Sequence, residues 1–221
     1  MSAESGVPTF RGEDGLWEGH HIEMVASPEG FARDPELVHR FYNLRRAALN
    51  TVEPNAGHLA LAQLEREWHG RFLLVTQNVD DLHERAGSEK LIHMHGELRK
   101  ARCECCGAVF SWSKDLASGT RCRACGEVGG MRPHIVWFGE FPFELEAIMN
   151  ALKSADIFLC IGTSGVVYPA AGFARQAAER ASCHLIEMNI ERTEISRHFH
   201  EHIVGPVSVE LPKLVQRLLS A

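Results

Sequence analysis

The sequence predicts an α/β fold built on a doubly wound parallel sheet, into which a small cysteine-rich module and a helical module are inserted. Three short apolar runs, at 72–76, 157–162 and 184–188, have the length and composition of buried parallel strands. Helical patterns precede the first run at 55–68 and separate the second run from the third at 168–180. Such alternation of strand and helix is typical of a doubly wound sheet.

A further helix is predicted to begin after Asp34, which can cap it, with Pro35 in the first helical position. Leu37 and Phe41 follow at helical spacing. We expect this helix to belong to a helical module over about residues 19–55.

The cysteine-rich module is expected at 96–130, because that stretch is rich in Cys and Gly and poor in long apolar runs. The sheet domain would then comprise residues 1–95 and 131–221.

Charge and composition limit the classes of function. The chain of 221 residues has a formal net charge of −6, which argues against a basic surface for nucleic acid or anionic lipid. No stretch approaches the roughly 20 apolar residues of a membrane span, and the N-terminal segment lacks the basic and apolar regions of a secretion signal. We therefore expect a cytoplasmic protein, a monomer, that binds neither membranes nor specific nucleic acid.

Four of the seven cysteines form two pairs with the spacing of zinc knuckles. Two residues separate Cys103 from Cys106, and the same spacing separates Cys122 from Cys125 after a gap of fifteen residues. Four thiolates complete a tetrahedral shell without an open position, so the expected zinc ion is structural, one per chain. Cys105 is not needed as a ligand. A chance cluster of free thiols is the alternative.

Polar segments follow two of the predicted strands at their carboxyl ends, where doubly wound sheets bind ligands. TQNVDDLH at 76–83 and HMHGE at 93–97 follow the first strand, and GTSG at 162–165 follows the second. Asn, Asp and His at such positions can bind ribose hydroxyls, orient a carboxamide and move a proton at neutral pH. The glycine-containing segment suits close approach to phosphate or sugar, or is a simple turn. Alone, these patterns indicate only a polar ligand site.

Taken in order, the segments resemble the sirtuin family, and within it the bacterial deacylases of class III, the CobB type. The resemblance runs along essentially the whole chain. The matching segments are SAESGVPTFRG at 2–12, TQNVDDLHERAG at 76–87, HMHGEL at 93–98, the two cysteine pairs, VWFGE at 136–140, GTSGVVYPAAG at 162–172 and EMN at 187–189.

The resemblance implies a Rossmann domain, a zinc-ribbon module, and NAD bound between them. It implies removal of succinyl, malonyl or acetyl groups from lysines of protein or peptide substrates that enter from the opposite side of the cleft. The acyl oxygen would attack the nicotinamide ribose as nicotinamide leaves. His95, as general base, would then help a ribose hydroxyl attack the resulting imidate. Lysine and O-acyl-ADP-ribose would be the products.

The same resemblance assigns residues to the NAD site. Gln77 and Asn78 would hold the ribose and order water, and Asp80 would bind the nicotinamide carboxamide. The other assignments are Phe10 and Arg11 on the cofactor loop, Gly162, Thr163 and Ser164 on the phosphate and ribose side, and Asn189 at the adenosine ribose.

Two groups of residues are expected to bind the substrate. Tyr42 and Arg45 stand three apart on a predicted helix and project from one face. A guanidinium beside a phenol suits a carboxylate, and the resemblance links this pair to succinyl and malonyl groups. A solvated helix face is the alternative. By the resemblance, a strand edge for pairing with the peptide backbone would come from Val136, Trp137, Phe138 and Gly139.

The start of the chain departs from the sirtuin pattern, in which an apolar strand leads into a Gly-Ala-Gly turn. Only the tail of that element appears here, as Met1–Glu4. Such a strand is central in the sheet and its turn cradles the pyrophosphate, so we expect reduced stability and weaker NAD binding. Two other interpretations follow: a truncated, weakly active or inactive sirtuin acting as a binding protein, or a zinc-ribbon binding module, which the net acidity disfavours.

Overall fold

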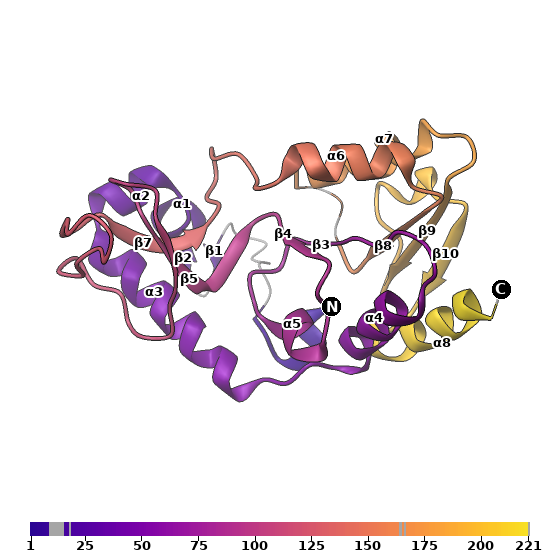
Figure 1. Cartoon of the computed structure of the whole chain (residues 1–221), viewed down its shortest axis with the longest axis horizontal. Coiled ribbons are helices and arrows are strands. Elements are labelled where there is room, and N and C mark those ends of the chain that lie inside the picture. The colour runs from indigo at the N-terminus through magenta and orange to yellow at the C-terminus, as the bar shows by residue number, and fades with distance from the viewer. Residues whose placement is uncertain (9–15, 18, 164, 166, 221) are drawn as a thin grey trace.

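The computed structural model describes residues 1–8, 16–17, 19–163, 165 and 167–220. Figure 1 shows an α/β part that holds both ends of the described chain, and a smaller part formed by helices and antiparallel strands. None of the helices in these ranges is long and apolar enough to cross a membrane.

The N-terminal region contains a short 3₁₀ helix, η1 (Ser2–Ser5), and then the helical module. The predicted helix after Asp34 is confirmed: the Asp34 carboxylate accepts a hydrogen bond from the Leu37 amide at 2.9 Å, and Pro35 is the first helical residue. The elements of the module are β1 (Leu16–Trp17), β2 (His20–His21), α1 (Ile22–Val25), α2 (Pro28–Arg33), α3 (Pro35–Ala48) and η2 (Leu49–Thr51).

The parallel strands form two sheets. All three apolar runs are strands, and the prediction of an α/β fold with parallel strands is confirmed. One continuous sheet was expected, however, and no strand in the described ranges pairs with both β3 and β8, so the two sheets stay separate. The first sheet pairs β3 (Leu74–Thr76) with β4 (Leu91–His93), and the second has the order β10 (Glu201–Val204), β9 (His184–Asn189), β8 (Ile157–Ile161).

Helices cover both faces of the second sheet, as a doubly wound arrangement requires. In Figure 1, α6 and α7 lie above the strands, and α4 and α8 lie below them. Alternate residues of β9 point to opposite faces of the sheet. Ile186 and Met188 therefore belong to the core between the sheet and α4 and α8, and Leu185 belongs to the core between the sheet and α6 and α7. The helices are α4 (Ala56–Glu67), α6 (Leu145–Ser154), α7 (Phe173–Ala178) after η3 (Ala170–Gly172), and α8 (Val207–Leu219).

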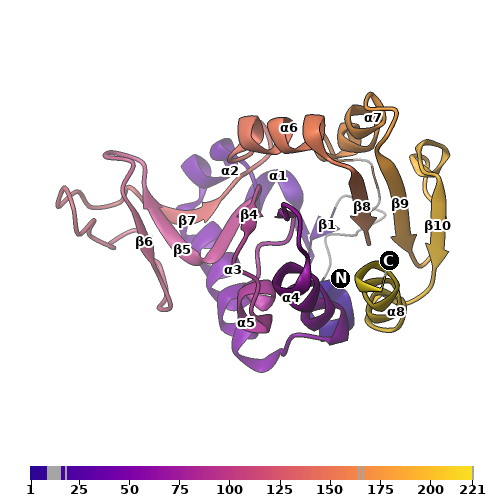
Figure 2. The same cartoon turned by 45° about the vertical axis from the view of Figure 1, so that its right-hand side comes forward.

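The cysteine-rich module is a three-stranded antiparallel sheet in the order β6–β5–β7. Its small core holds Ala101, Leu116 and Met131 beside Cys103 and Cys122. Figure 2 shows β5 and β6 projecting away from the α/β part. The strands are β5 (Gly96–Cys103), β6 (Val109–Ser111) and β7 (Met131–Ile135), so the sheet of this module continues past residue 130. The remaining elements are α5 (Leu82–Ala86) and η4 (Ser196–His198).

A cavity of about 1590 Å³ lies where the two parallel sheets and the helical module meet. Side chains and backbone of β3 and β8 line it on the α/β side, and Ala26, Tyr42 and Arg45 line it on the helical side. The cavity runs between the two sheets along the whole of β3 and β8 and includes their carboxyl ends, where ligands bind in doubly wound sheets.

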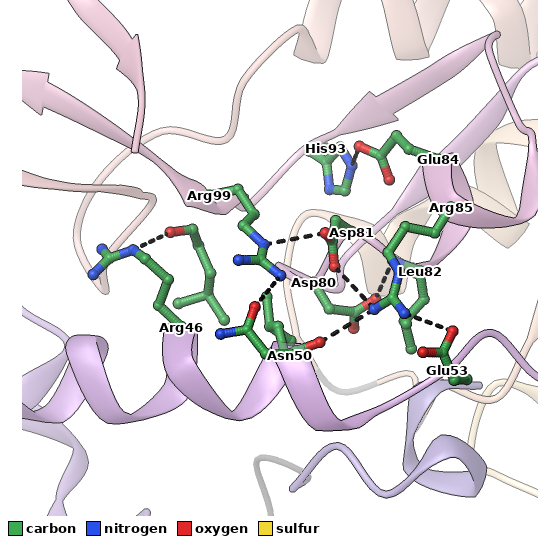
Figure 3. Close-up of polar contacts among 12 residues, drawn as sticks. Arg46, Asn50, Glu53, Asp80, Asp81, Leu82, Glu84, Arg85, His93 and Arg99 are labelled. Atoms are coloured by element: carbon green, nitrogen blue, oxygen red, sulfur yellow. Dashed lines mark hydrogen bonds and ion pairs between the residues drawn. The ribbon is translucent and has the colours of Figure 1, made fainter. Parts of the chain in front are cut away.

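Buried polar contacts attach α3 to the cysteine-rich module. The Arg46 guanidinium donates to the carbonyl oxygen of Leu98 at 2.7 Å (Figure 3). It also donates to the Asn43 side chain at 2.8 Å. Asn43 in turn exchanges two hydrogen bonds with the backbone of Leu116. Burial lowers the pKa of Arg46 to about 10, so the side chain stays charged at neutral pH. These contacts fix the helix that carries Tyr42.

We expect Arg46→Leu to lower the free energy of unfolding by about 1–3 kcal/mol, because the buried carbonyl of Leu98 loses its donor. Urea denaturation followed by circular dichroism measures the change. Arg40→Leu is the matched control, because Arg40 is exposed on the same helix, and its effect should stay within about 0.5 kcal/mol. Equal losses in the two variants would contradict the anchoring role of Arg46.

Candidate functional site

His95 lies at the cavity, between the end of β4 and the start of β5. Its Nδ1 is 3.2 Å from the carbonyl oxygen of Gln77. A carbonyl can only accept, so Nδ1 carries the proton and Nε2 keeps its lone pair. Burial lowers the pKa of His95 below its ordinary value, which leaves the ring neutral at pH 7. The geometry is that of a general base with a fixed tautomer.

The backbone beside His95 is held by a close approach of β5 and β7. The amide of Val136 donates to the carbonyl oxygen of His95 at 2.9 Å. Gly96 has φ +86°, and a Cβ at this position would overlap the carbonyl oxygen of His134. Only glycine fits here, because a side chain would clash with backbone and the left-handed conformation disfavours other residues.

The polar residues predicted after β3 and β8 lie together. Gln77 Nε2 donates to Thr163 Oγ1 at 3.3 Å, which joins the ends of the two parallel sheets. The side-chain amide of Asn189 donates through Nδ2 to the carbonyl oxygen of Thr163 at 2.8 Å. Gly162 has φ +60° and a Cβ there would come within 2.9 Å of the Met1 backbone nitrogen. Four of the expected NAD-site residues therefore surround one part of the cavity.

Asp80 and Asn78 meet at Ser2, a residue to which the sequence analysis gave no role. Asn78 Nδ2 donates to Ser2 Oγ at 2.7 Å. Asp80 is 3% exposed, and burial raises the pKa of its carboxyl group although hydrogen bonds from Ser2 and the Leu82 amide oppose the shift. His58 Nε2 lies 3.4 Å from Ser2 Oγ on the other side. The segment 2–12 was recognised as a motif, but nothing in it singles out Ser2.

Three of the expected site residues, Phe10, Arg11 and Ser164, lie outside the residues that the structure describes. Their assignment to the cofactor loop and the phosphate side stays a prediction.

Tyr42 and Arg45 both line the cavity from α3. Tyr42 is fully buried, its hydroxyl accepts a hydrogen bond from Trp137 Nε1 at 2.9 Å, and burial raises its pKa. Arg45 is 7% exposed, with its guanidinium 5.6 Å from the centre of the Phe41 ring. The alternative of a solvated helix face is therefore wrong. A buried cation and a phenol adjoin the same cavity.

The amides of the expected peptide-binding segment donate mostly within the chain. Val136 donates to His95, Trp137 donates to the Glu140 carboxylate at 2.8 Å, and Phe138 donates to the carbonyl oxygen of Ala26 at 2.9 Å. β7 ends at Ile135, so residues 136–138 follow the strand. Their pairing with a peptide backbone stays a prediction. Among the described residues, the amide of Gly139 has no acceptor within the chain.

Arg132 holds this segment in place. Its guanidinium contacts both oxygens of the Glu140 carboxylate, at 2.7 and 3.0 Å, and lies 3.1 Å from the centre of the Trp137 ring. The buried Trp137 indole in turn donates to Tyr42. The segment expected to bind the peptide is thus in contact with Tyr42, one of the two residues expected to bind the carboxylate.

The four predicted zinc ligands converge. The Sγ atoms of Cys103, Cys106, Cys122 and Cys125 all lie within 4.8 Å of one another. The Cys103–Cys125 and Cys106–Cys122 separations are 3.8 and 3.7 Å. Zn–S bonds of about 2.3 Å in a tetrahedron give sulfur–sulfur edges of about 3.8 Å, so the set fits zinc. Amide hydrogen bonds, from Cys125 and then Ala124, lower the pKa of Cys122 to about 6. Cys105 is exposed and outside the set.

Comparison with known proteins gives the same assignment along the chain. The model of the Sir2 family matches residues 1–169. The NAD-dependent protein deacylase of Bdellovibrio bacteriovorus is 56% identical over 221 residues, which cover 99% of this chain and 93% of the relative. The NAD-dependent protein deacylase of Vibrio vulnificus is 54% identical over 222 residues, with 100% of this chain and 90% of the relative covered.

Solved structures agree with these relatives. A complex of a Sir2 homologue with NAD has a TM-score of 0.89 and 39% identity, covering 99% of this chain and 86% of that one. Sir2Af2 bound to a myristoylated histone peptide has a TM-score of 0.73 and 35% identity, covering 90% and 86%. With the family model matching most of the chain and relatives above half identity along its whole length, this protein belongs to the Sir2, or sirtuin, family.

Proposed function

We propose that the protein is an NAD-dependent protein deacylase that removes acyl groups from lysine side chains and yields nicotinamide and O-acyl-ADP-ribose. The observation that carries this proposal is the neutral His95, with a fixed tautomer, beside the polar ends of β3 and β8 at a large cavity. The relatives with more than half of their residues identical are named as NAD-dependent protein deacylases.

The residues of the site divide the work of the reaction. NAD, when bound, supplies the ribose carbon to which the acyl group is transferred as nicotinamide leaves. His95 Nε2 accepts the proton of a ribose hydroxyl, and the carbonyl of Gln77 stabilises the charged ring through Nδ1. We assign Gln77 and Asn78 to the ribose, Asp80 to the carboxamide, and Thr163 with Gly162 to the phosphate and ribose side. Asn189 would hold the second ribose.

We propose that the preferred acyl groups carry a carboxylate, as succinyl and malonyl groups do. Arg45 is a largely buried cation at the cavity. Tyr42 adds a hydroxyl group, which accepts a hydrogen bond from the Trp137 indole. A carboxylate that reaches this position would be bound by charge-assisted hydrogen bonds away from bulk water. An acetyl group has no charge to place there.

For the substrate backbone we propose pairing with the segment after β7. Val136, Trp137 and Phe138 would flank the peptide. The amide of Gly139, which has no acceptor among the residues that the structure describes, would donate to it. Backbone pairing binds lysine substrates with limited dependence on their sequence.

The four cysteines would hold one structural zinc ion. A closed shell of four thiolates has no position for water, so the ion stabilises the module and takes no part in the reaction. We further propose that the protein acts as a monomer in the cytoplasm and needs no nucleic acid, in line with its net charge of −6.

We expect His95→Ala to abolish deacylation of a succinylated peptide and formation of O-acyl-ADP-ribose, because the base acts on the ribose hydroxyl after nicotinamide has left. Chromatography of nicotinamide and O-acyl-ADP-ribose measures it, and binding of the peptide should persist. Turnover at the wild-type rate in this variant would contradict the role of His95.

At low pH, the fall of kcat/KM should follow the protonation of His95. The base works only when neutral, and burial lowers its pKa below the ordinary value of about 6.5. Activity should therefore be fully present at neutral pH and fall only as the pH drops through that lowered pKa. A half-maximal point above about pH 7 would assign this limb to another group.

Arg45→Met should lower kcat/KM for a succinylated peptide by about tenfold or more, because a charge-assisted hydrogen bond is lost. Turnover of the acetylated peptide should change much less, and Tyr42→Phe should show the same selectivity with a smaller loss. Arg40→Met, which changes an exposed residue of the same helix, should affect neither substrate. An equal loss for both substrates in the Arg45 variant would withdraw the acidic-acyl assignment.

Protein purified without chelator should contain about one zinc ion per chain. Cys122→Ser should lose the metal and unfold the module, whereas Cys105→Ser should retain both metal and fold, because Cys105 lies outside the cluster. Metal analysis and thermal unfolding measure these outcomes. Less than about half an equivalent of zinc in the wild-type protein would count against the site.

A further inference from the structure

His93, two residues before His95, makes a similar contact with the next residue of the same turn. Its Nδ1 is 3.1 Å from the carbonyl oxygen of Asn78. Its Nε2 is 2.7 Å from a carboxylate oxygen of Glu84, in α5 (Figure 3). The His93 side chain is only 7% exposed, whereas that of Glu84 is 41% exposed.

The two partners of His93 determine its charge. A backbone carbonyl and a carboxylate both only accept, so both ring nitrogens must carry protons for the two contacts to form. Burial lowers the pKa of His93, but the hydrogen bond and charge of Glu84 outweigh it, and the pKa is raised overall. For Glu84, burial raises the pKa, and the contacts with His93 bring it below its usual value. The pair is an imidazolium and a carboxylate.

The other titratable groups around His93 do not replace this pair. His83, in α5, has its pKa lowered to about 4 by burial and then by the charge of His93, so it stays neutral. Asp80, after β3, feels the charge of His93 but has its pKa raised by burial. Glu97, in β5, favours the charged form of His93 from a distance. Glu84 is the neighbour that contacts the ring.

A metal ion is the competing use of this cluster. Ligand atoms of Glu84, His93 and Glu97 lie within 4.8 Å of one another. However, both ring nitrogens of His93 have acceptors at hydrogen-bond distance, and Glu97 forms an ion pair with Lys100 at 2.6 Å. A metal would have to displace a proton and break that ion pair, so the geometry favours a proton at this position.

We propose that His93, as an imidazolium paired with Glu84, is a positioning residue for NAD: it holds the turn of Gln77 and Asn78 in the shape that binds the ribose. Asn78 presents its side chain to the cavity while its own carbonyl is bound by His93. When the ring loses one proton to water, it has a single N–H left and can donate to only one of its two partners. The turn then loses a constraint and NAD binds more weakly. This inference rests on the proposed NAD site.

The direction of the pH dependence follows from the raised pKa of His93. The charged, holding form is present at lower pH and is lost as the pH rises through that pKa. NAD affinity should therefore be highest on the acid side of this titration and fall on the alkaline side. Replacing Glu84 by Gln removes the neighbouring charge, lowers the pKa of His93, and should move the fall to lower pH.

Calorimetric titration of NAD into the protein without peptide, from about pH 6 to about pH 9, tests the proposal. In the wild type, Kd should rise by about fivefold or more across this range. In Glu84→Gln the rise should begin at lower pH. In His93→Lys the side chain stays charged throughout, so Kd should be nearly constant. The NMR titration of the His93 ring should have the same midpoint as the loss of affinity.

Glu53→Gln is the matched control. Glu53 forms an ion pair with Arg85 of α5 at 2.6 Å, so this variant weakens a tether of the same helix without touching His93. Its NAD titration should match the wild type. An unchanged profile in Glu84→Gln, an equal shift in Glu53→Gln, or a pH-dependent Kd in His93→Lys would overturn the proposal.

Failure of the proposed function gives a different result from failure of this inference. If wild-type protein released no nicotinamide with any acylated peptide, the deacylase assignment would fail while the calorimetric result could still hold. If nicotinamide were released and NAD affinity did not follow the protonation of His93, only the positioning role would fail.

Discussion

The site depends on how hydrogen bonding continues where the pairing of β3 and β4 ends. Backbone contacts flank the turn on both sides: the Met94 amide donates to the carbonyl of Thr76, and the Leu98 amide donates to the carbonyl of Val79. The two carbonyls between them, those of Gln77 and Asn78, are bound by the imidazoles of His95 and His93. Side chains thus supply two steps of the ladder. This arrangement both satisfies the buried carbonyls and sets the proton on each ring.

The side of the cavity that is proposed to bind the acyl group depends on contacts between segments distant in the chain. Arg132 binds Glu140 and covers the ring of Trp137, whose indole donates to Tyr42. Arg46, one turn after Tyr42 on α3, attaches the helix to the Leu98 carbonyl. The pair expected to bind the carboxylate therefore sits on a helix that is held by two sets of buried contacts.

Much of this arrangement follows from local sequence patterns. The apolar runs identified three strands, the cap at Asp34 identified α3, and the spacing of the cysteines identified the metal cluster. β4 and β10 escaped prediction because they are short and contain polar residues, such as His93 and His202, that interrupt the apolar pattern. The split into two parallel sheets also lay beyond local patterns, because strand pairing joins residues far apart in the chain.

The candidate site was predictable to a similar degree, and the limit has the same cause. Motifs named Gln77, Asn78, Asp80 and His95, but the roles of Ser2 and of the pair formed by His93 and Glu84 depend on which segments meet in space. Tyr42 and Trp137 were assigned separately, and the hydrogen bond between them spans 95 residues. A residue pattern gives the types of group present, whereas the partners of each group come from the fold.

Gly96 has a consequence for how this protein can change over time. It carries no functional group, yet the backbone oxygen of His134 occupies the space that any side chain would need. Substitution of Gly96 should therefore be rejected during evolution. A side chain there would push β5 and β7 apart and displace the neighbouring imidazole of His95. In a survey of viable variants, Gly96 should tolerate substitution as poorly as His95, although only His95 is proposed to take part in the reaction.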